Sequence, residues 1–237
     1  MADLSPILVV TGMAREARIA SGPGVVVVQA GGSPTRLRAL LGTRDKPNCR
    51  AVVSFGIAGG LDPKLVPGDV LVATGLVTRS GRLPADPRLV ELLAGLLRSG
   101  DLRPALRDLL GADDPVLHPT VKSALHAETG AGAVDMESHV AMEYAARHGL
   151  PFAAVRVVCD PAERALPGFV TDALKPDGGV ALSVLLRSLA RQPMQLGALM
   201  QLASDARTSF RALTRCRQAI GVGLGAVEFG PTLGHLV

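Results

Sequence analysis

The sequence predicts an α/β fold, with strands and helices alternating along a chain of 237 residues. Hydrophobic residues make up 48% of the chain and charged residues 19%, a balance that supplies a core and argues against disorder. Short β-branched runs alternate with amphipathic segments, which is typical of a sheet covered by helices. Several of these runs end in glycine or aspartate, so we expect loops with polar groups at the strand ends.

Short apolar runs predict the strands, because they are too short for buried helices and several are too β-branched to favour them. The predicted strands cover residues 6–10, 25–29, 51–55, 69–74 and 152–159, with a strand end at 133–135. The third strand runs into a glycine-rich segment at 56–60, which we interpret as a loop.

Amphipathic segments predict the helices, and Ser33 followed by Pro34 is a typical helix start. The predicted helices cover residues 34–41, 86–98, 120–128, 138–148 and 178–190. Residues 99–119 are rich in Gly, Pro, Arg and Asp and predict no element. We therefore expect one domain over residues 1–191 and a basic, partly amphipathic extension over residues 192–237.

The C-terminal extension is rich in arginine. Arg207, Arg211 and Arg215 recur every four residues, so they share one face if the segment is helical. A basic amphipathic helix can lie on an anionic membrane surface, which predicts peripheral membrane contact through residues 192–217. The alternative is a helix packed on the core with a solvated basic edge.

Composition excludes several function classes. The net charge is +4, but aromatic residues make up 3% and Trp is absent, so nucleic-acid binding is not expected. Cys49, Cys159 and Cys216 form no zinc-site spacing and fit a reducing compartment. We find no signal peptide and no apolar run near the ~18 residues that span a bilayer. We therefore expect a cytoplasmic protein without a metal site.

Two glycine-containing segments follow predicted strands. In TGMAREAR, Glu16 lies one turn beyond the first strand; the alternative to a functional carboxylate is an acidic residue that favours a helix N-terminus. In SFGIAGGL, Gly56 and Gly59 would let backbone amides approach a ligand, and the alternative is a tight turn. The second segment lacks the Lys-Ser/Thr of a P-loop and is not GxGxxG, so ATP and dinucleotides are not supported.

Two further segments place carboxylates near strand ends. In VDMES, a carboxylate could accept hydrogen bonds from a vicinal diol while Met136 lies on an apolar sugar face; alternatively, Asp135 and Glu137 only favour a helix start. In VRVVCD, Arg156 interrupts an apolar strand and Asp160 follows it. A carboxylate in such surroundings can serve as a general acid, and the alternative is a structural Arg–Asp pair.

Gly12, Gly56, Asp135 and Asp160 all lie where predicted strands end. Ligands of open α/β sheets bind beyond the carboxyl ends of the strands, so we expect one site from these four positions.

The blocks TGMAREAR, SFGIAGGL, VDMES and VRVVCDPA together resemble the methylthioadenosine/S-adenosylhomocysteine nucleosidases of the purine nucleoside phosphorylase superfamily. Within it, the chain most resembles the hopanoid-associated phosphorylases, over about residues 6–190. The resemblance implies a three-layer fold with a central mixed β-sheet flanked by helices, in which residues 1–191 are catalytic. It also implies a homodimer and no cofactor.

The resemblance implies a role for each matching residue. Glu16 would hold the attacking water, Arg156 would position that nucleophile, and Asp160 would protonate purine N7. Met136 and Glu137 would bind the ribose. The residues implied to bind substrate are Gly12, Gly56, Ala58, Gly59, Met136 and Glu137. Cys159 and Ile57 stand where the nucleosidases usually have serine, and the thiol of Cys159 is a weaker hydrogen-bond partner for Asp160 than a serine hydroxyl.

The implied reaction is cleavage of an N-glycosidic bond, releasing adenine from a lipid-linked nucleoside, adenosylhopane. Water is the expected nucleophile, because residues 53–55, directly before the glycine-rich block, contain no Arg, and Glu16 would repel phosphate although Arg15 and Arg18 lie nearby in the sequence. The alternatives are a phosphorylase with phosphate as co-substrate, a methylthioadenosine/S-adenosylhomocysteine nucleosidase, and a nucleoside-binding protein without catalysis.

Overall fold

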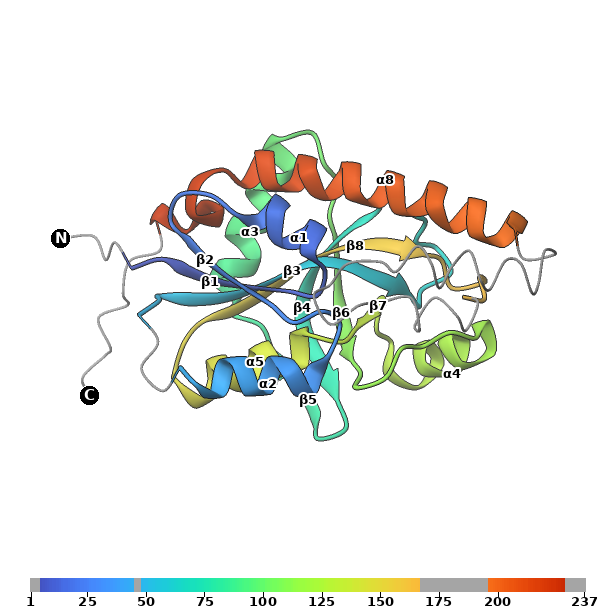
Figure 1. The fold of residues 1–237 in the computed structure, drawn as a ribbon, viewed down its shortest axis with the longest axis horizontal. Helices are drawn as coiled ribbons and strands as arrows, with labels where there is room; N and C mark the ends of the chain where they lie inside the picture. The colour runs from blue at the N-terminus through green and yellow to red at the C-terminus, as the bar shows by residue number, and fades with distance from the viewer. Residues whose placement is uncertain (1–4, 45–47, 167–195, 229–237) are drawn as a thin grey trace.

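A computed structural model describes residues 5–44, 48–166 and 196–228 of the chain. It has the predicted α/β fold, with an eight-stranded sheet between two layers of helices. Figure 1 shows α1, α3 and α8 on one side of the sheet and α2 and α5 on the other. Within the described residues, no helix is long and apolar enough to cross a bilayer.

The strands are β1 (Ile7–Thr11), β2 (Val25–Gln29), β3 (Ala51–Gly60), β4 (Val70–Thr78), β5 (Gly81–Pro84), β6 (Ala105–Gly111), β7 (Ala133–Asp135) and β8 (Phe152–Asp160). The helices are α1 (Ala14–Ala20), α2 (Pro34–Gly42), α3 (Pro87–Ser99), α4 (Pro119–Thr129), α5 (Ser138–Arg147), α8 (Leu196–Ile220) and the 3-10 helix η2 (Val222–Glu228). As predicted, Ser33 caps α2 by accepting a hydrogen bond from the Arg36 amide at 3.3 Å. The helix predicted over 178–190 lies outside the described residues.

The sheet is mixed, as predicted, and part of it closes on itself. Its strand order is β2-β1-β3-β7-β6-β4-β5, and β8 pairs with both β3 and β4. The pairing is parallel between β3 and β8 and antiparallel between β8 and β4. The strands β3, β8, β4, β6 and β7 therefore form a ring in which each has two paired neighbours.

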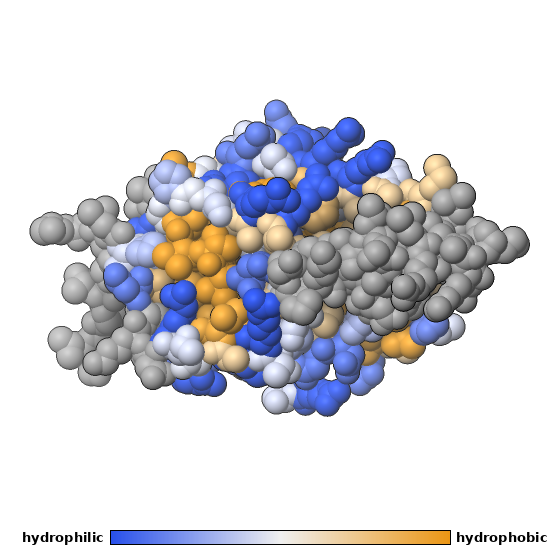
Figure 2. Space-filling view, in the orientation of Figure 1, coloured by the Kyte–Doolittle hydropathy of each residue, from blue (hydrophilic) through white to orange (hydrophobic). Residues whose placement is uncertain are grey.

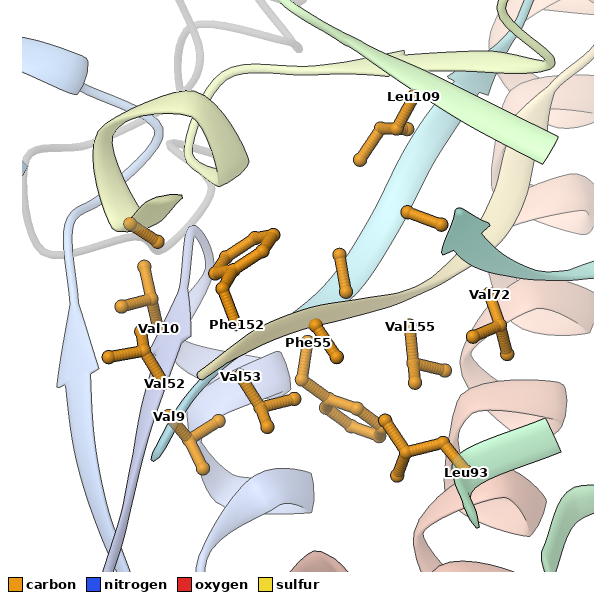
Figure 3. Close-up of a cluster of buried hydrophobic side chains, with 14 of the residues drawn as sticks. Val9, Val10, Val52, Val53, Phe55, Val72, Leu93, Leu109, Phe152 and Val155 are labelled. Carbon is orange, nitrogen blue, oxygen red and sulfur yellow. The ribbon is translucent and has the colours of Figure 1, made fainter. Parts of the chain in front are cut away.

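The core lies around β1, β3 and β8. All residues of β1 and β8 are buried, which explains why their sequences are continuous rather than alternating apolar runs. Figure 3 shows Val9, Val53, Phe55 and Val155 among the side chains that fill this region. Hydrophobic residues also gather on the face drawn in Figure 2, over β1 and β2, and Val26 of β2 is 36% exposed.

The glycine-rich segment is not the predicted loop, because β3 continues through it to Gly60. Its backbone stays paired with β8, with Gly56 opposite Arg156. A Cβ on Gly56 would lie 2.5 Å from Glu16 Oε1 and 2.6 Å from an Arg156 nitrogen. Glycine is therefore required here for close packing against a paired strand, and not for a turn.

Residues 99–119 contain β6, which the sequence did not reveal. Polar residues interrupt the apolar pattern of β6. One of them, Asp108, binds a side chain of the edge strand β5. Arg82 of β5 donates to both Asp108 oxygens, at 2.5 and 2.8 Å, and Thr74 of β4 donates at 2.7 Å. This pairing ties β5 to the neighbouring strands.

The helix α8 lies along β8 and buries one face against the sheet (Figure 1). Phe210, Leu213 and Cys216 are buried there. Ser209 fixes the helix further by donating its hydroxyl to the Val158 carbonyl oxygen at 2.8 Å. The predicted basic face forms, since Arg207, Arg211 and Arg215 are all exposed; α8 is thus a packed helix with a solvated basic edge.

Candidate active site

A cavity of about 430 Å³ opens where β1, β3, β7 and β8 end. The strand ends and the segments that follow them supply one wall, and the C-terminal helix supplies another. The lining residues are Gly12, Met13, Glu16, Gly31, Gly32, Ile57, Ala58, Gly59, Asp114, Pro115, Val116, Val134, Asp135, Met136, Glu137, Cys159, Asp160, Leu166, Leu199, Leu202, Ala203, Ala206 and Phe210.

The titratable side chains of this lining are acidic groups: the carboxyls of Glu16, Asp114, Asp135, Glu137 and Asp160, and the Cys159 thiol. Among the described residues, no Arg or Lys lines the cavity. The remaining lining is largely apolar. Such a cavity suits an uncharged ligand that develops positive charge during a reaction, and it disfavours an anion.

Backbone amides that follow β1 and one amide within β3 hold the Glu16 carboxylate. One oxygen accepts hydrogen bonds from the amides of Gly12 and Met13, at 2.8 and 2.7 Å. The other accepts from the amide of Ile57 at 2.8 Å. Burial raises the pKa of Glu16, while the nearby Arg156 and these three amides lower it. The group is therefore oriented before any ligand arrives.

Arg156 lies behind the cavity, with none of its surface exposed, and links several carboxylates. It forms ion pairs with Asp135 at 2.5 Å and with Glu137 at 3.5 Å. It also donates to Ser54 Oγ at 2.5 Å and to the Ile57 carbonyl at 3.2 Å. A structural Arg156–Asp160 pair was the alternative from the sequence, and it is wrong: the partner of Asp160 is a lysine.

Asp135 and Glu137 differ in role although they are two residues apart. Asp135 accepts hydrogen bonds from the amide and the hydroxyl of Ser138, the first residue of α5, so it helps to start that helix. Glu137 makes no such capping bond. Burial, opposed by Arg156, raises the pKa of Glu137 to about 8. Glu137 is thus the carboxyl of this pair that is available to a ligand.

Asp160 ends β8 and pairs with Lys122 of α4. The Lys122 ammonium also donates to the carbonyl oxygen of Pro161 at 3.0 Å. Burial raises the pKa of Asp160, and the opposing effect of Lys122 is smaller. The neighbouring Cys159 is a neutral thiol, because burial and then the charge of Asp160 raise its pKa to about 12.

The sequence matches one known family over most of its length. Residues 7–179 match the profile of the Phosphorylase superfamily. The chain belongs to this superfamily. The predicted superfamily is thereby confirmed, and the match covers all the strand ends that build the cavity.

Two curated relatives match part of the chain. The chain is 27% identical to the 5'-methylthioadenosine/S-adenosylhomocysteine nucleosidases of Mycobacterium tuberculosis and Mycobacterium bovis. Each match covers 50% of this chain and 62% of the relative, so the chain spans less than two thirds of the length of these relatives.

Solved structures share the fold at lower identity. The 5'-methylthioadenosine/S-adenosylhomocysteine nucleosidase of Neisseria meningitidis, in complex with methylthio-immucillin-A, has a TM-score of 0.68 at 15% identity and covers 91% of this chain and 98% of its own. The futalosine hydrolase of Helicobacter pylori has a TM-score of 0.64 at 16% identity, with coverage of 91% and 98%. The phosphorylase-superfamily fold predicted from the sequence is confirmed.

The structure brings most of the predicted site residues to one cavity. Those that line it are Gly12, Glu16, Ala58, Gly59, Met136, Glu137 and Asp160. The other two, Gly56 and Arg156, lie directly behind Glu16. Their chemical roles stay predictions.

Sequence reasoning missed two parts of the site: Lys122 and the α8 residues of the wall. The segment 114–116 lies in the region around residues 100–120 that was expected to help form the base pocket, although its residues were not predicted. A lone lysine in a polar helix gives no signal in the sequence. The apolar positions of α8 were visible, but nothing in their spacing indicated that they face a ligand cavity.

Proposed function

We propose that this chain is a purine nucleosidase that cleaves the N-glycosidic bond with water. One observation supports this above all: Glu16, Glu137 and Asp160 come from three distant parts of the chain and line a single cavity. A structural role does not require three carboxyl groups to converge on an apolar cavity.

In the proposed reaction Asp160 gives its proton to purine N7. The electron pair of the C1'–N9 bond leaves with the purine, and the sugar develops oxocarbenium character. The Glu16 carboxylate, in its ionised form, stabilises that positive charge. Water then forms the new C–O bond at C1' and releases its proton, and Glu16 is its acceptor. The amides of Gly12 and Met13 occupy both lone-pair sites of Glu16 Oε2, but Oε1 accepts only from the Ile57 amide and keeps a site that can orient this water.

Glu137 and Met136 are the proposed ribose contacts. The Glu137 carboxyl lines the cavity and makes no capping bond, so it can accept hydrogen bonds from the ribose hydroxyls. Arg156 pairs with Glu137 from behind and holds that carboxyl in place.

Water is favoured over phosphate as the nucleophile. A phosphate would meet a lining without Arg or Lys among the described residues. Arg15 and Arg18 of the first block are exposed, and Arg15 stacks over the Phe210 ring at 4.2 Å rather than lining the cavity. The amides that would suit an anion already bind Glu16.

The finer proposal is a lipid-linked substrate, adenosylhopane, in hopanoid synthesis. It rests on the resemblance to hopanoid-associated phosphorylases, and the apolar wall that α8 presents to the cavity supports it. Contact of the exposed arginines of α8 with an anionic membrane belongs to the same proposal, and co-sedimentation with anionic vesicles at low salt tests it. The proposed homodimer is tested by light scattering.

The deciding experiment measures adenine release from methylthioadenosine and from adenosylhopane, each with and without phosphate. Release from adenosylhopane alone, without phosphate, supports the finer proposal. Release from methylthioadenosine alone supports a methylthioadenosine/S-adenosylhomocysteine nucleosidase, and release that requires phosphate contradicts hydrolysis.

Asp160→Asn separates an enzyme from a binding protein. We expect the variant to fold and to lose about 10²–10⁴-fold in rate, because asparagine cannot protonate N7. Asp101→Asn, an exposed carboxylate outside the cavity, is the matched control and should keep full activity. Equal rates for the two variants would sink the assignment of Asp160.

A further inference from the structure

Lys122 is buried against expectation. It lies in α4, where it is the one residue of the helix that is fully buried, while its neighbour Val121 is 46% exposed. A helix that only needed to cover the sheet would bury the valine and expose the lysine. Burying an ammonium group is unfavourable unless it is paired, so this location needs the charge.

The Lys122 ammonium is fully satisfied in its place. It donates to the Asp160 carboxylate, to the Pro161 carbonyl oxygen at 3.0 Å and to the Arg164 carbonyl oxygen at 3.3 Å. Three donors meet three acceptors, and a neutral amine would lack one of these protons. The contacts fix Lys122 against the strand end that bears Asp160 and against the segment that follows it.

The carboxyls of Glu16, Asp114, Asp135 and Glu137 line the same cavity as Asp160, and the charged groups that act on Asp160 itself are Lys122 and Arg164. Arg164 follows it along the chain, and its side chain forms an ion pair with Asp205 of α8. The Cys159 thiol precedes it and is neutral. The charge in direct contact with the Asp160 carboxylate is therefore that of Lys122.

We propose that Lys122 is a positioning residue, which orients Asp160 and stabilises the carboxylate that Asp160 becomes on giving its proton to the leaving group. This inference rests on the proposed function. In the reaction one O–H bond of Asp160 breaks and one N–H bond of the purine forms, while Lys122 keeps its protons. Lys122 supplies a fixed cationic hydrogen-bond donor to Asp160, whereas the thiol of the neighbouring Cys159 is only a weak donor.

The direction of the effect follows from the charges. An adjacent ammonium favours the ionised form of a carboxyl, so removing it should raise the pKa of Asp160 by about 1–3 units. If Asp160 acts in its protonated form, activity is lost as the pH rises through this pKa. The high-pH limb of the kcat/KM profile should therefore move to higher pH in Lys122→Met.

The test compares Lys122→Met with Lys122→Arg, which keeps the charge, and with Lys64→Met, which removes an exposed lysine. The Asp160 carboxyl is titrated by carbon-13 NMR and assigned by its absence in Asp160→Asn. We expect a shift of about 1–3 pH units upward in Lys122→Met, none in Lys64→Met and a smaller one in Lys122→Arg. Should Lys122→Met fail to fold, Lys122→Gln removes the same charge with a polar side chain.

An Asp160 titration that is unchanged in the folded Met or Gln variant overturns the proposal. So does a kcat/KM profile for methylthioadenosine whose high-pH limb stays in place while only its height falls. The NMR titration needs no turnover, so an inactive wild-type protein would count against the proposed nucleosidase and not against the coupling between Lys122 and Asp160.

Discussion

Close packing in the site depends on Gly56, a residue that has no side chain. Glu16 Oε1 and an Arg156 nitrogen lie only 2.5 and 2.6 Å from the position that a Cβ of Gly56 would take. The carboxylate that is proposed to hold water and the guanidinium behind it can approach each other only because residue 56 is glycine. The chemistry of the site thus depends on the absence of one methyl group.

Gly56→Ala should therefore lower the stability of the fold by about 1–3 kcal/mol, because the added methyl displaces Glu16 or Arg156. Gly95→Ala is the matched control, since a Cβ at Gly95 within α3 meets nothing within 4 Å. The control should be neutral or more stable by about 0.5–1 kcal/mol. Urea unfolding measures both, and equal midpoints for the two variants would contradict the packing argument.

Glu137 predicts a pH dependence of stability. Burial raises its pKa from an ordinary value near 4.5 to about 8. Between these values the folded protein binds a proton that the unfolded chain has lost, so this group makes the fold less stable as the pH rises. Glu137→Gln removes that loss. Its free energy of unfolding should fall less than that of the wild type between about pH 5 and pH 8, by on the order of 3 kcal/mol.

Urea unfolding at several pH values tests this prediction. The difference between wild type and Glu137→Gln should grow steadily over the range. Parallel curves would show that Glu137 is ionised throughout, with Arg156 outweighing burial.

At the scale of elements, α8 has two functions. One face of α8 packs on β8, and the arginines of the opposite face are exposed to solvent. Residues in the N-terminal half of the helix also line the cavity. Leu213 lies fully buried in the packed face. The position and face of an α8 residue therefore decide whether its substitution changes the stability of the fold, the lining of the cavity or the charge of the surface.

Leu213→Ala should cost about 2–5 kcal/mol of stability, because it leaves a cavity against the sheet. Arg211→Ala, two residues away and exposed, should change stability by less than about 0.5 kcal/mol. Thermal unfolding of both variants gives the answer. A small loss in Leu213→Ala would mean that the helix contributes little to the fold.

The sequence predicted the elements whose residues are uniform in character. The valine-rich β2 begins and ends where expected, since such a run favours only a strand. Other elements were missed or shortened. The strand β5 was not predicted, because its four residues are all exposed and form no apolar run. The second half of β3 was interpreted as a loop because its glycines have low strand propensity, and β6 escaped because its polar residues serve a partner on β5 that is distant in sequence.

For the molecule as a whole, the predictable site residues are those that directly follow a strand in the sequence, because the strand and the polar residue then belong to one short segment. Glu16, Glu137 and Asp160 are of this kind. Lys122 and the α8 wall were not, because they reach the cavity through the folded arrangement of remote segments. The ring of strands explains this difference. It brings the ends of β7 and β8 together at the cavity, and helices that are remote in the sequence pack next to those ends.

Removal of the C-terminal segment tests how far the fold depends on it. A chain of residues 1–191 would expose the sheet face that Phe210, Leu213 and Cys216 cover. We expect such a chain to lose cooperative unfolding, as followed by circular dichroism in urea. A sharp two-state transition close to that of the full chain would show instead that residues 192–237 are an independent extension.

The thiol of Cys159 has a consequence for handling the protein. It lines the cavity beside the proposed acid, a location where an oxidised or alkylated sulfur would block any ligand. Yet nucleophilic attack requires a thiolate, and a pKa of about 12 leaves almost none at neutral pH. The cavity therefore contains a sulfur atom that is sheltered from electrophiles and peroxide, and exposure to air should leave it in its reduced form.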